Sequence, residues 1–224
     1  DWMTDGKSPD TVNPSLWRHM GLLRKHGLYA LADNIWQVRG FDVSNMTIIK
    51  GQTGWIIIDP LTSRDTAAAA LKLVNEKLGA RPVTAVVYSH SHGDHFGGVR
   101  GIINEADVKA GKVAIIAPEH FLAETASENV MAGPAMSRRA TFQFGTNLTP
   151  GPQGTMGSGI GRGIGGGDIT LIPPTIDIRK TGELREVDGV TLEFQMVPQS
   201  EAPAEMNVYM PAARTFLAAE IATC

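Results

Sequence analysis

The chain has 224 residues, of which 42% are hydrophobic and 19% charged, and its formal net charge is −3 at pH 7. This length and apolar content predict one large domain with a substantial core. The slight negative charge argues against nucleic acid or an anionic membrane as a partner, because both attract basic surfaces. No run of 18 apolar residues occurs, so no membrane span is expected, and the single cysteine, Cys224, excludes a disulfide within the chain.

Residues 1–33 are polar with scattered aromatic side chains, and we expect them to form an N-terminal extension packed on the core. Within this segment, residues 15–29 are typical of a helix. We interpret its histidines, His19 and His26, as surface or capping residues, because a histidine far from other ligands is a weak metal signal. The remaining residues, 34–224, are expected to form the main domain.

Strands and one helix are predicted at the start of the main domain. Three short apolar strands, separated by turn-forming residues, are expected at 34–41, 45–51 and 54–60. A helix follows over 63–79, with Ser63 or Asp65 as its N-cap and Gly79 at its end. Residues 82–89, PVTAVVYS, then predict a buried strand, because they are apolar and rich in β-branched side chains.

The segment after that strand, SHSHGDHFGG at residues 89–98, carries four potential metal ligands within six positions. In an extended segment His90 and His92 point to the same side, so both can bind one metal ion. Asp94 and His95 follow on the turn and can reach a second ion. Imidazole and carboxylate donors suit Zn²⁺, with Mn²⁺ and iron as alternatives. A solvated histidine-rich loop is the competing interpretation, and the density of ligands argues against it.

The rest of the chain is predicted to alternate between helices and strands around one irregular segment. Helices are expected over 94–105 and 122–131. Strands are expected at 113–121, 168–178, 190–199 and 215–220. A turn at Asp188–Gly189 is expected directly before the third of them. Residues 131–168 show little periodicity, and their glycine-rich part, 151–167, is either a flexible linker or an anion-binding loop over the active site. The whole pattern favours a layered α/β fold.

A site with two metal ions needs more ligands than the cluster supplies, and no histidine follows His120. Glu201 and Glu220 each follow a predicted strand, and strand ends on one sheet converge, so both can face the cluster. Glu205 competes with them for this role. Asp59, at the end of an apolar strand, is suited to orienting a histidine ring. We interpret His120 as a structural residue.

Several blocks of the sequence, together with the H-x-H-x-D-H cluster, resemble a known family. They are PDTVNPSLWR, WQVRGFDVSNMTII, TGWIIIDPLTS, SHSHGDHFGGVRG, SENVMAG, AMSRRA, PQSEAPAEMNVYMP and AAEIAT. On these blocks the chain resembles the metallo-β-lactamase superfamily and, more narrowly, its alkylsulfatases, which cleave alkyl sulfate esters such as dodecyl sulfate. The resemblance implies an αββα sandwich, with residues 34–224 as its catalytic domain. Because the chain stops in an apolar run, we expect this domain to be truncated, with its downstream part absent.

The resemblance also implies a zinc-dependent hydrolase that holds two zinc ions per active site. Such an enzyme releases an alcohol and inorganic sulfate by means of an activated hydroxide. His90 and His92 then bind one zinc ion, and Asp94 and His95 bind the other. Asp94 is also expected to act in catalysis by orienting the hydroxide.

Carried over in the same way, Glu201 and Glu220 are the glutamate ligands, and the last histidine ligand of the family lies beyond residue 224. The negative sulfate group needs cationic or N–H donors, and Arg138 and Arg139 are the candidates for binding it. The alkyl tail needs an apolar surface, which nearby side chains could supply: Met131, Met136, Phe142, Phe144 and Met156.

Partners and location follow from the resemblance alone. It implies an alkyl sulfate as a small-molecule substrate and a bacterial periplasmic or secreted enzyme. It also implies a homodimer formed through a region missing from this chain, or association with a chain that carries the downstream part.

Three alternatives remain open. The first is another hydrolase on the same fold, such as a lactamase, lactonase, thioesterase or phosphodiesterase. The second is an oxidoreductase that holds two iron ions with similar ligands. The third is a non-catalytic fragment or subunit. Metal content distinguishes the second from the others, and a test for hydrolysis distinguishes the third.

Overall fold

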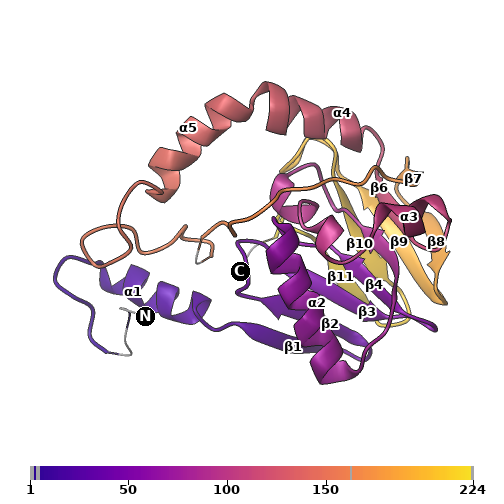
Figure 1. Ribbon diagram of the computed structural model, residues 1–224, viewed down its shortest axis with the longest axis horizontal. Coiled ribbons are helices and arrows are strands. Elements are labelled where there is room, and N and C mark those ends of the chain that lie inside the picture. The colour runs from indigo at the N-terminus through magenta and orange to yellow at the C-terminus, as the bar shows by residue number, and fades with distance from the viewer. Residues whose placement is uncertain (1–2, 4–5, 162, 223–224) are drawn as a thin grey trace.

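The computed structural model describes residues 3, 6–161 and 163–222 of the chain. Two β-sheets stack face to face, and helices α2 (Arg64–Leu78) and α3 (Glu105–Lys109) cover the outer face of the larger sheet (Figure 1). One apolar core lies between the two sheets, and another lies between the larger sheet and its helices. This layered α/β sandwich confirms the fold class expected from the sequence.

The larger sheet has seven strands in chain order, antiparallel from β1 to β4 and parallel from β4 to β7. These strands are β1 (Gly27–Ala32), β2 (Ile35–Arg39), β3 (Met46–Lys50), β4 (Trp55–Ile58), β5 (Val83–Val87), β6 (Ala114–Pro118) and β7 (Ile176–Ile178). All four residues of β4 are buried, because this strand lies in the middle of the sheet with an apolar core on each face. The strands predicted for β2 to β6 are therefore confirmed.

Helix α2 begins and ends where the sequence predicts. The Ser63 hydroxyl, rather than Asp65, accepts a hydrogen bond from the backbone N–H of Thr66, and the Thr66 side chain completes a capping box. Gly79 ends the helix with a φ of +94°, a backbone conformation that side chains rarely adopt.

The expected helix over residues 15–29 is only partly correct. Helix α1 spans Pro14–Leu23, capped by the side chain of Asn13, and residues from Gly27 onward form strand β1 instead. β1 pairs antiparallel with β2, so it is the edge strand of the larger sheet. The pairing with β2 outweighs the local helical pattern of these residues. The expected division of the chain at residues 33 and 34 stays a prediction.

Residues 94–105 do not form the single helix that we expected. Two short 3₁₀ turns, η1 (Gly93–His95) and η2 (Val99–Gly101), replace it. Between them, a Cβ atom at Gly98 would lie 2.0 Å from the carbonyl oxygen of Pro60. The chain therefore follows the neighbouring backbone closely here, and this close approach is incompatible with a regular helix bearing side chains.

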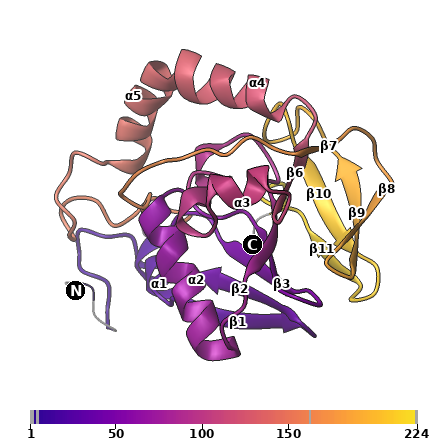
Figure 2. The same cartoon turned by 45° about the vertical axis from the view of Figure 1, so that its right-hand side comes forward.

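Residues 121–144 form a helical arm that rises away from the two sheets (Figures 1 and 2). Helix α4 (Phe121–Ala126) runs into a single π-helical turn, η3 (Ser127–Met131), so the helix predicted over 122–131 is present with this irregularity. Helix α5 (Gly133–Phe144) follows, in a segment that we expected to be irregular. α5 contains no buried residue, so it does not pack an apolar face into either core.

The smaller sheet is antiparallel, with the strand order β11-β10-β9-β8. Its strands are β8 (Glu183–Val187), β9 (Val190–Met196), β10 (Met206–Met210) and β11 (Thr215–Leu217). β8 and β10 were not predicted, whereas the turn at Asp188–Gly189 joins β8 to β9 as expected. The strand predicted over 168–178 is reduced to β7, because Pro173 and Pro174 cannot donate the hydrogen bonds of a ladder.

The glycine-rich segment is packed along the protein rather than loose. The backbone N–H of Gly165 donates to the Asp42 carboxylate at 2.8 Å, and a Cβ atom at Gly165 would lie 2.6 Å from that carboxylate. This contact contradicts the flexible-linker interpretation, and anion binding by the segment stays a prediction. Among the described residues, no helix is long and apolar enough to cross a membrane.

Candidate metal centre

The histidine cluster lies directly after β5, at the carboxyl end of a strand in the parallel part of the larger sheet. His90 and His95 are buried, and the side chain of His92 is about a quarter exposed, at 27%. Residues Gly93–His95 form the 3₁₀ turn η1, which brings Asp94 and His95 back towards His90. The strand alternation therefore places the candidate ligands His90 and His92, and the tight turn places the candidate ligands Asp94 and His95.

The two glutamates expected as ligands lie beside this cluster. Glu201 follows β9, and its Oε2 atom is 3.2 Å from Nε2 of His90 and 3.1 Å from Nδ1 of His92. Glu220 follows β11, and its Oε2 atom is 4.0 Å from Nε2 of His90 and 3.7 Å from Nε2 of His95. The larger sheet thus supplies the imidazoles and the smaller sheet supplies the glutamates.

The ligand atoms fall into two groups that share one residue. The first group comprises His90, His92, Glu201 and Glu220, and the second comprises Asp94, His95 and Glu220. Within each group the donor atoms lie within 4.8 Å of one another. Glu220 belongs to both groups, so this arrangement can hold two adjacent cations with a carboxylate between them.

The donor atoms themselves fit a divalent metal ion. Nε2 of His90 and Nε2 of His95 are buried and make no hydrogen bond within the described part of the chain. A buried polar atom without a partner is costly, and a bound cation would satisfy both nitrogens. Neutral imidazoles and carboxylates are the donors that zinc and similar ions prefer.

Asp59 holds two of the histidine rings from behind, as the sequence suggested. Its carboxylate accepts hydrogen bonds from the Ser89 N–H and hydroxyl, both at 2.8 Å, and lies 2.9 Å from Nδ1 of His95. The Ser89 hydroxyl donates to Asp59, so it is free to accept from Nδ1 of His90, 2.9 Å away. In both rings the proton then sits on Nδ1, which leaves Nε2 free to bind a cation.

Glu205, the competitor of Glu201, has a different place. It is fully buried, and its Oε2 atom accepts hydrogen bonds from the Ser200 hydroxyl and from the backbone N–H groups of Glu201 and Ala202. Glu205 therefore stabilises the turn that carries Glu201, and it belongs to neither ligand group.

The buried charges shift the pKa values of the cluster in both directions. Burial, with the nearby positive charges of His95 and His92, lowers the pKa of His90 to about 2. Burial opposes ionisation of Asp94, but the neighbouring His95 lowers the pKa of Asp94 to about 2. Burial also disfavours a charged His95, yet Asp59 and Asp94 raise the His95 pKa well above its ordinary value. Asp94 is consequently ionised at neutral pH, and His90 is neutral.

His92 also has a raised pKa, and one cause lies in a segment that the sequence did not single out for the site. Burial lowers the pKa of His92, but Glu201, Glu128 and Asp94 outweigh it and raise the value to about 9. Glu128 lies in the π-helical turn η3, 3.4 Å from Nε2 of His92, and accepts a hydrogen bond from the Ser91 hydroxyl at 2.6 Å. The residues around Glu128 do not show the spacing of metal ligands, so only the packing of η3 reveals that Glu128 lies beside His92.

Arg138 and Arg139, expected to bind sulfate, lie on the exposed helix α5. Within the described residues, neither arginine has an ion pair or hydrogen bond with the cluster, and their role stays a prediction. Of the apolar side chains expected to contact an alkyl tail, Met131, Met136 and Phe142 are exposed. Cys224 lies outside the described residues.

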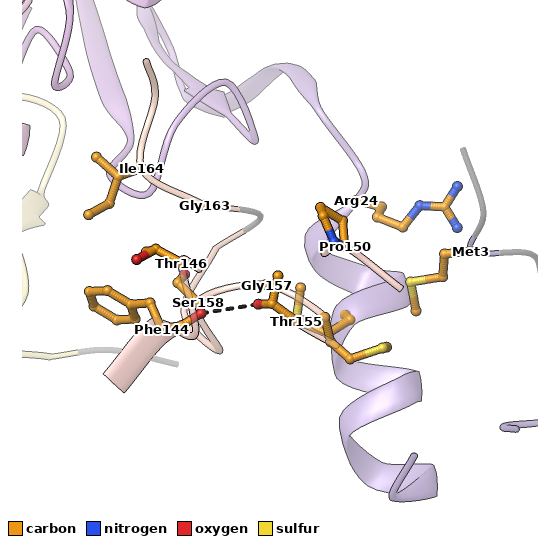
Figure 3. A pocket seen from close by; sticks show the side chains of 12 residues that line it. Met3, Arg24, Phe144, Thr146, Pro150, Thr155, Gly157, Ser158, Gly163 and Ile164 are labelled. Atoms are coloured by element: carbon orange, nitrogen blue, oxygen red, sulfur yellow. Dashed lines mark hydrogen bonds between the residues drawn. The ribbon is translucent and has the colours of Figure 1, made fainter. Parts of the chain in front are cut away.

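The other two expected tail contacts, Phe144 and Met156, line a separate cavity of about 490 Å³ between α1 and the glycine-rich segment (Figure 3). None of its lining residues belongs to the metal cluster. The isolated histidines His19 and His26 are exposed, as expected of surface residues. Their rings contact the carbonyl oxygens of Gly159 and Arg24, and the His26 ring also lies edge-on to Phe41. His120 precedes α4 in a left-handed conformation and belongs to neither ligand group.

Two stacked sheets with a cluster of histidine, aspartate and glutamate ligands at their strand ends define a metal-binding α/β sandwich protein. The sequence profile of the Metallo-beta-lactamase superfamily matches residues 39–194. The chain therefore belongs to the metallo-β-lactamase superfamily, and the family and the cluster together indicate a divalent metal site.

Its more similar relatives are alkylsulfatases. A linear primary-alkylsulfatase of a Pseudomonas species is 52% identical over 216 residues, covering 96% of this chain and 32% of that protein. An alkyl/aryl-sulfatase of Saccharomyces cerevisiae is 51% identical, covering 96% of this chain and 33% of that protein. A solved stereoselective inverting sec-alkylsulfatase of a Pseudomonas species has a TM-score of 0.89 at 48% identity, covering 94% of this chain and 33% of that one. This chain thus spans about a third of the length of these relatives.

Proposed function

We propose that this chain is the metal-binding part of an alkylsulfatase that uses two zinc ions to hydrolyse alkyl sulfate esters to an alcohol and inorganic sulfate. The observation that carries the proposal is the pair of ligand groups joined by Glu220. The identity of about 50% to alkylsulfatases over nearly the whole chain supports the substrate class. Zinc is favoured because every donor in the two groups is an imidazole or a carboxylate.

The candidate ligands of this chain would be shared between the two ions. His90, His92 and Glu201 would hold one ion, Asp94 and His95 the other, and Glu220 would contact both. When bound, the metal supplies positive charge that lowers the pKa of water and neutralises the sulfate group. Asp59 and Ser89 would accept the proton on Nδ1 of His95 and of His90, so that Nε2 of each ring faces the ion.

Asp94 is the residue that we propose to act in catalysis as well as in metal binding. Its low pKa keeps the carboxylate ionised at neutral pH, so it can accept a hydrogen bond from an attacking water molecule and orient it. The same negative charge would repel the sulfate ester if the metal charges did not offset it. Sulfate binding by Arg138 and Arg139 requires that substrate reach the exposed face of α5.

The proposal extends to partners and location on the family resemblance alone. We infer a homodimer, or an association with a chain that carries the downstream part, and a periplasmic or secreted enzyme. Size measurement in solution and fractionation of the producing cells test these two inferences directly.

The test combines elemental analysis with an assay of sulfate release from dodecyl sulfate. We expect about two zinc ions per chain together with sulfate release, by the usual coordination numbers of zinc. Substitution of Glu220 by Gln should lower both, because this residue belongs to both ligand groups. Substitution of the exposed Glu186 by Gln is the matched control and should change neither.

Three results would overturn the proposal. Iron in place of zinc would favour an oxidoreductase. Hydrolysis of a lactone, thioester or phosphodiester without sulfate release would replace the substrate class. Absence of bound metal would exclude a metal-dependent activity of this chain.

A further inference from the structure

The π-helical turn η3 brings a carboxylate to the outer side of the histidine cluster. A π-helical turn adds one residue to a helix and so rotates the side chains that follow, and such turns are frequent at functional sites. In this chain the turn lies between α4 and α5 and places Glu128 next to the loop after β5. The helical arm, which otherwise rises away from the sheets, contacts the metal centre through this turn (Figure 1).

The two nitrogens of His92 face two different carboxylates. Nδ1 lies 3.1 Å from Oε2 of Glu201, within the first ligand group, whereas Nε2 lies 3.4 Å from Oε1 of Glu128. Only one nitrogen of a ring can bind the ion together with Glu201, and that is Nδ1. The opposite nitrogen, Nε2, then carries a proton and needs an acceptor.

Glu128 is held in place independently of His92. Its second oxygen, Oε2, accepts a hydrogen bond of 2.6 Å from the Ser91 hydroxyl. The next residue, Asn129, donates from its side chain to the Ser91 carbonyl at 3.0 Å and to the Thr125 carbonyl at 2.9 Å. These bonds fix the π-helical turn against the ligand loop, so the position of the Glu128 carboxylate does not depend on a bound ion.

We propose that Glu128 is a positioning residue for the metal centre, which accepts the proton on Nε2 of His92 and so directs Nδ1 towards the ion. The inference rests on the proposed metal function. Asp59 positions His95 in the same way by contacting its Nδ1 directly, and it positions His90 through the Ser89 hydroxyl. Each of the three histidines then has a carboxylate behind it, and the one behind His92 comes from a different element, the helical arm.

The test measures zinc affinity by competition with a chromogenic chelator, in the chain with Glu128 changed to Ala or to Gln. Loss of a carboxylate behind a metal-binding histidine typically weakens metal binding about 10-fold to 100-fold, and we expect E128A to fall in that range. E128Q keeps the volume, the bond from Ser91 and one acceptor oxygen, so its affinity should lie between those of E128A and the unchanged chain. The control is E124Q, which removes a carboxylate one turn earlier on α4 and should bind zinc as the unchanged chain does.

Nitrogen NMR of the histidine rings separates positioning from a merely structural role. In the zinc-bound chain we expect the His92 proton on Nε2, and in E128A we expect a mixture of ring forms. Thermal unfolding of the metal-free E128Q variant verifies that the variant folds.

The possible results are distinct. Zinc affinity of both Glu128 variants equal to that of the unchanged chain would overturn the inference while leaving the proposed metal function intact. An equal loss of affinity in E124Q would also overturn it, because the effect would then be one of overall charge. If the unchanged chain bound no zinc, the proposed function itself would fail, and this inference with it.

Discussion

At the residue scale, the candidate metal centre depends on the side chains that contact the candidate ligands as well as on those ligands. Asp59 has a φ of +56°, a left-handed conformation that aspartate and asparagine tolerate better than most residues. This conformation ends β4 and turns the carboxylate towards Ser89 and His95. One buried carboxylate thus determines which nitrogen of two rings is free.

We predict that changing Asp59 to Asn weakens zinc binding about 10-fold, because asparagine keeps the backbone conformation and volume but lacks the negative charge that accepts the His95 proton. Chelator competition measures the effect. Asp33 changed to Asn, an exposed carboxylate away from the cluster, is the control. Equal zinc affinity of the Asp59 variant and the unchanged chain would show that the charge of Asp59 is dispensable.

At the element scale, one turn connects the two sheets. Asp188, between β8 and β9, accepts hydrogen bonds from the backbone N–H groups of Thr53 and Gly54 and from the hydroxyls of Thr53 and Thr84. Burial acts to raise the pKa of Asp188, but these bonds outweigh it and lower the value. The turn of the smaller sheet is therefore attached to the β3–β4 turn of the larger one.

We predict that Asp188 changed to Asn lowers the free energy of unfolding by about 1–2 kcal/mol at neutral pH, since several bonds to a charged acceptor are weakened at a partly exposed site. Because the folded-state pKa of Asp188 lies below the unfolded value of about 3.9, the stabilisation is present above pH 4 and is lost as pH falls through the folded-state pKa. Urea unfolding from pH 7 down to pH 3 measures this. If the difference in free energy of unfolding between the unchanged chain and the Asp188 variant stayed constant down to pH 3, the lowered pKa of Asp188 would be contradicted.

The glycine-rich segment supplies a second prediction at this scale. A Cβ atom at Gly165 would lie 2.6 Å from the Asp42 carboxylate and 2.7 Å from the Thr66 methyl group, whereas one at Gly166 would meet nothing within 4 Å. We predict that Gly165 changed to Ala destabilises the protein by about 1–3 kcal/mol through overpacking. Gly166 changed to Ala, the matched control, should lie within about 0.5 kcal/mol of the unchanged chain in urea unfolding. Equal stability of the two variants would mean that the segment is not packed against Asp42.

At the scale of the whole molecule, the candidate metal centre joins the two sheets. The histidines follow a strand of the larger sheet, and Glu201 and Glu220 follow strands of the smaller one. An ion held by both groups would therefore cross-link the sheets at one edge, while the Asp188 turn connects them elsewhere. Binding to the folded state alone must then raise stability.

We predict that zinc at about 100 times its dissociation constant raises the free energy of unfolding by about 2.7 kcal/mol, which for a chain of this size is a rise of roughly 5–10 °C in the unfolding temperature. Thermal unfolding with zinc and with excess chelator measures the shift. The Glu220 to Gln variant should show a smaller shift, because it loses a ligand from the smaller sheet. A zinc-induced shift of the same size in that variant would argue against a cross-link through Glu220.

Local features of the chain were predictable from its sequence. The helix α2 with its Ser63 cap, the buried strands β4 and β5 and the turn at Asp188–Gly189 all depend on neighbouring residues. The four candidate ligands of the histidine cluster also lie within six positions, where strand alternation and a tight turn decide their directions. Such features depend on contacts between residues that are close in sequence, so a local pattern of residues is enough to predict them.

Only the tertiary structure decided the features that depend on distant contacts. β1 is a strand because it pairs with β2, and α5 is a helix although none of its residues is buried. The sequence names Glu201 and Glu220 as candidates through strand ends on one sheet, but they reach the histidines from the second sheet, by stacking of the two sheets. The approach of Glu128 to His92 requires a π-helical turn to pack against a loop 37 residues earlier in the chain. Those contacts arise from burial and packing between elements, and no local pattern of residues encodes them.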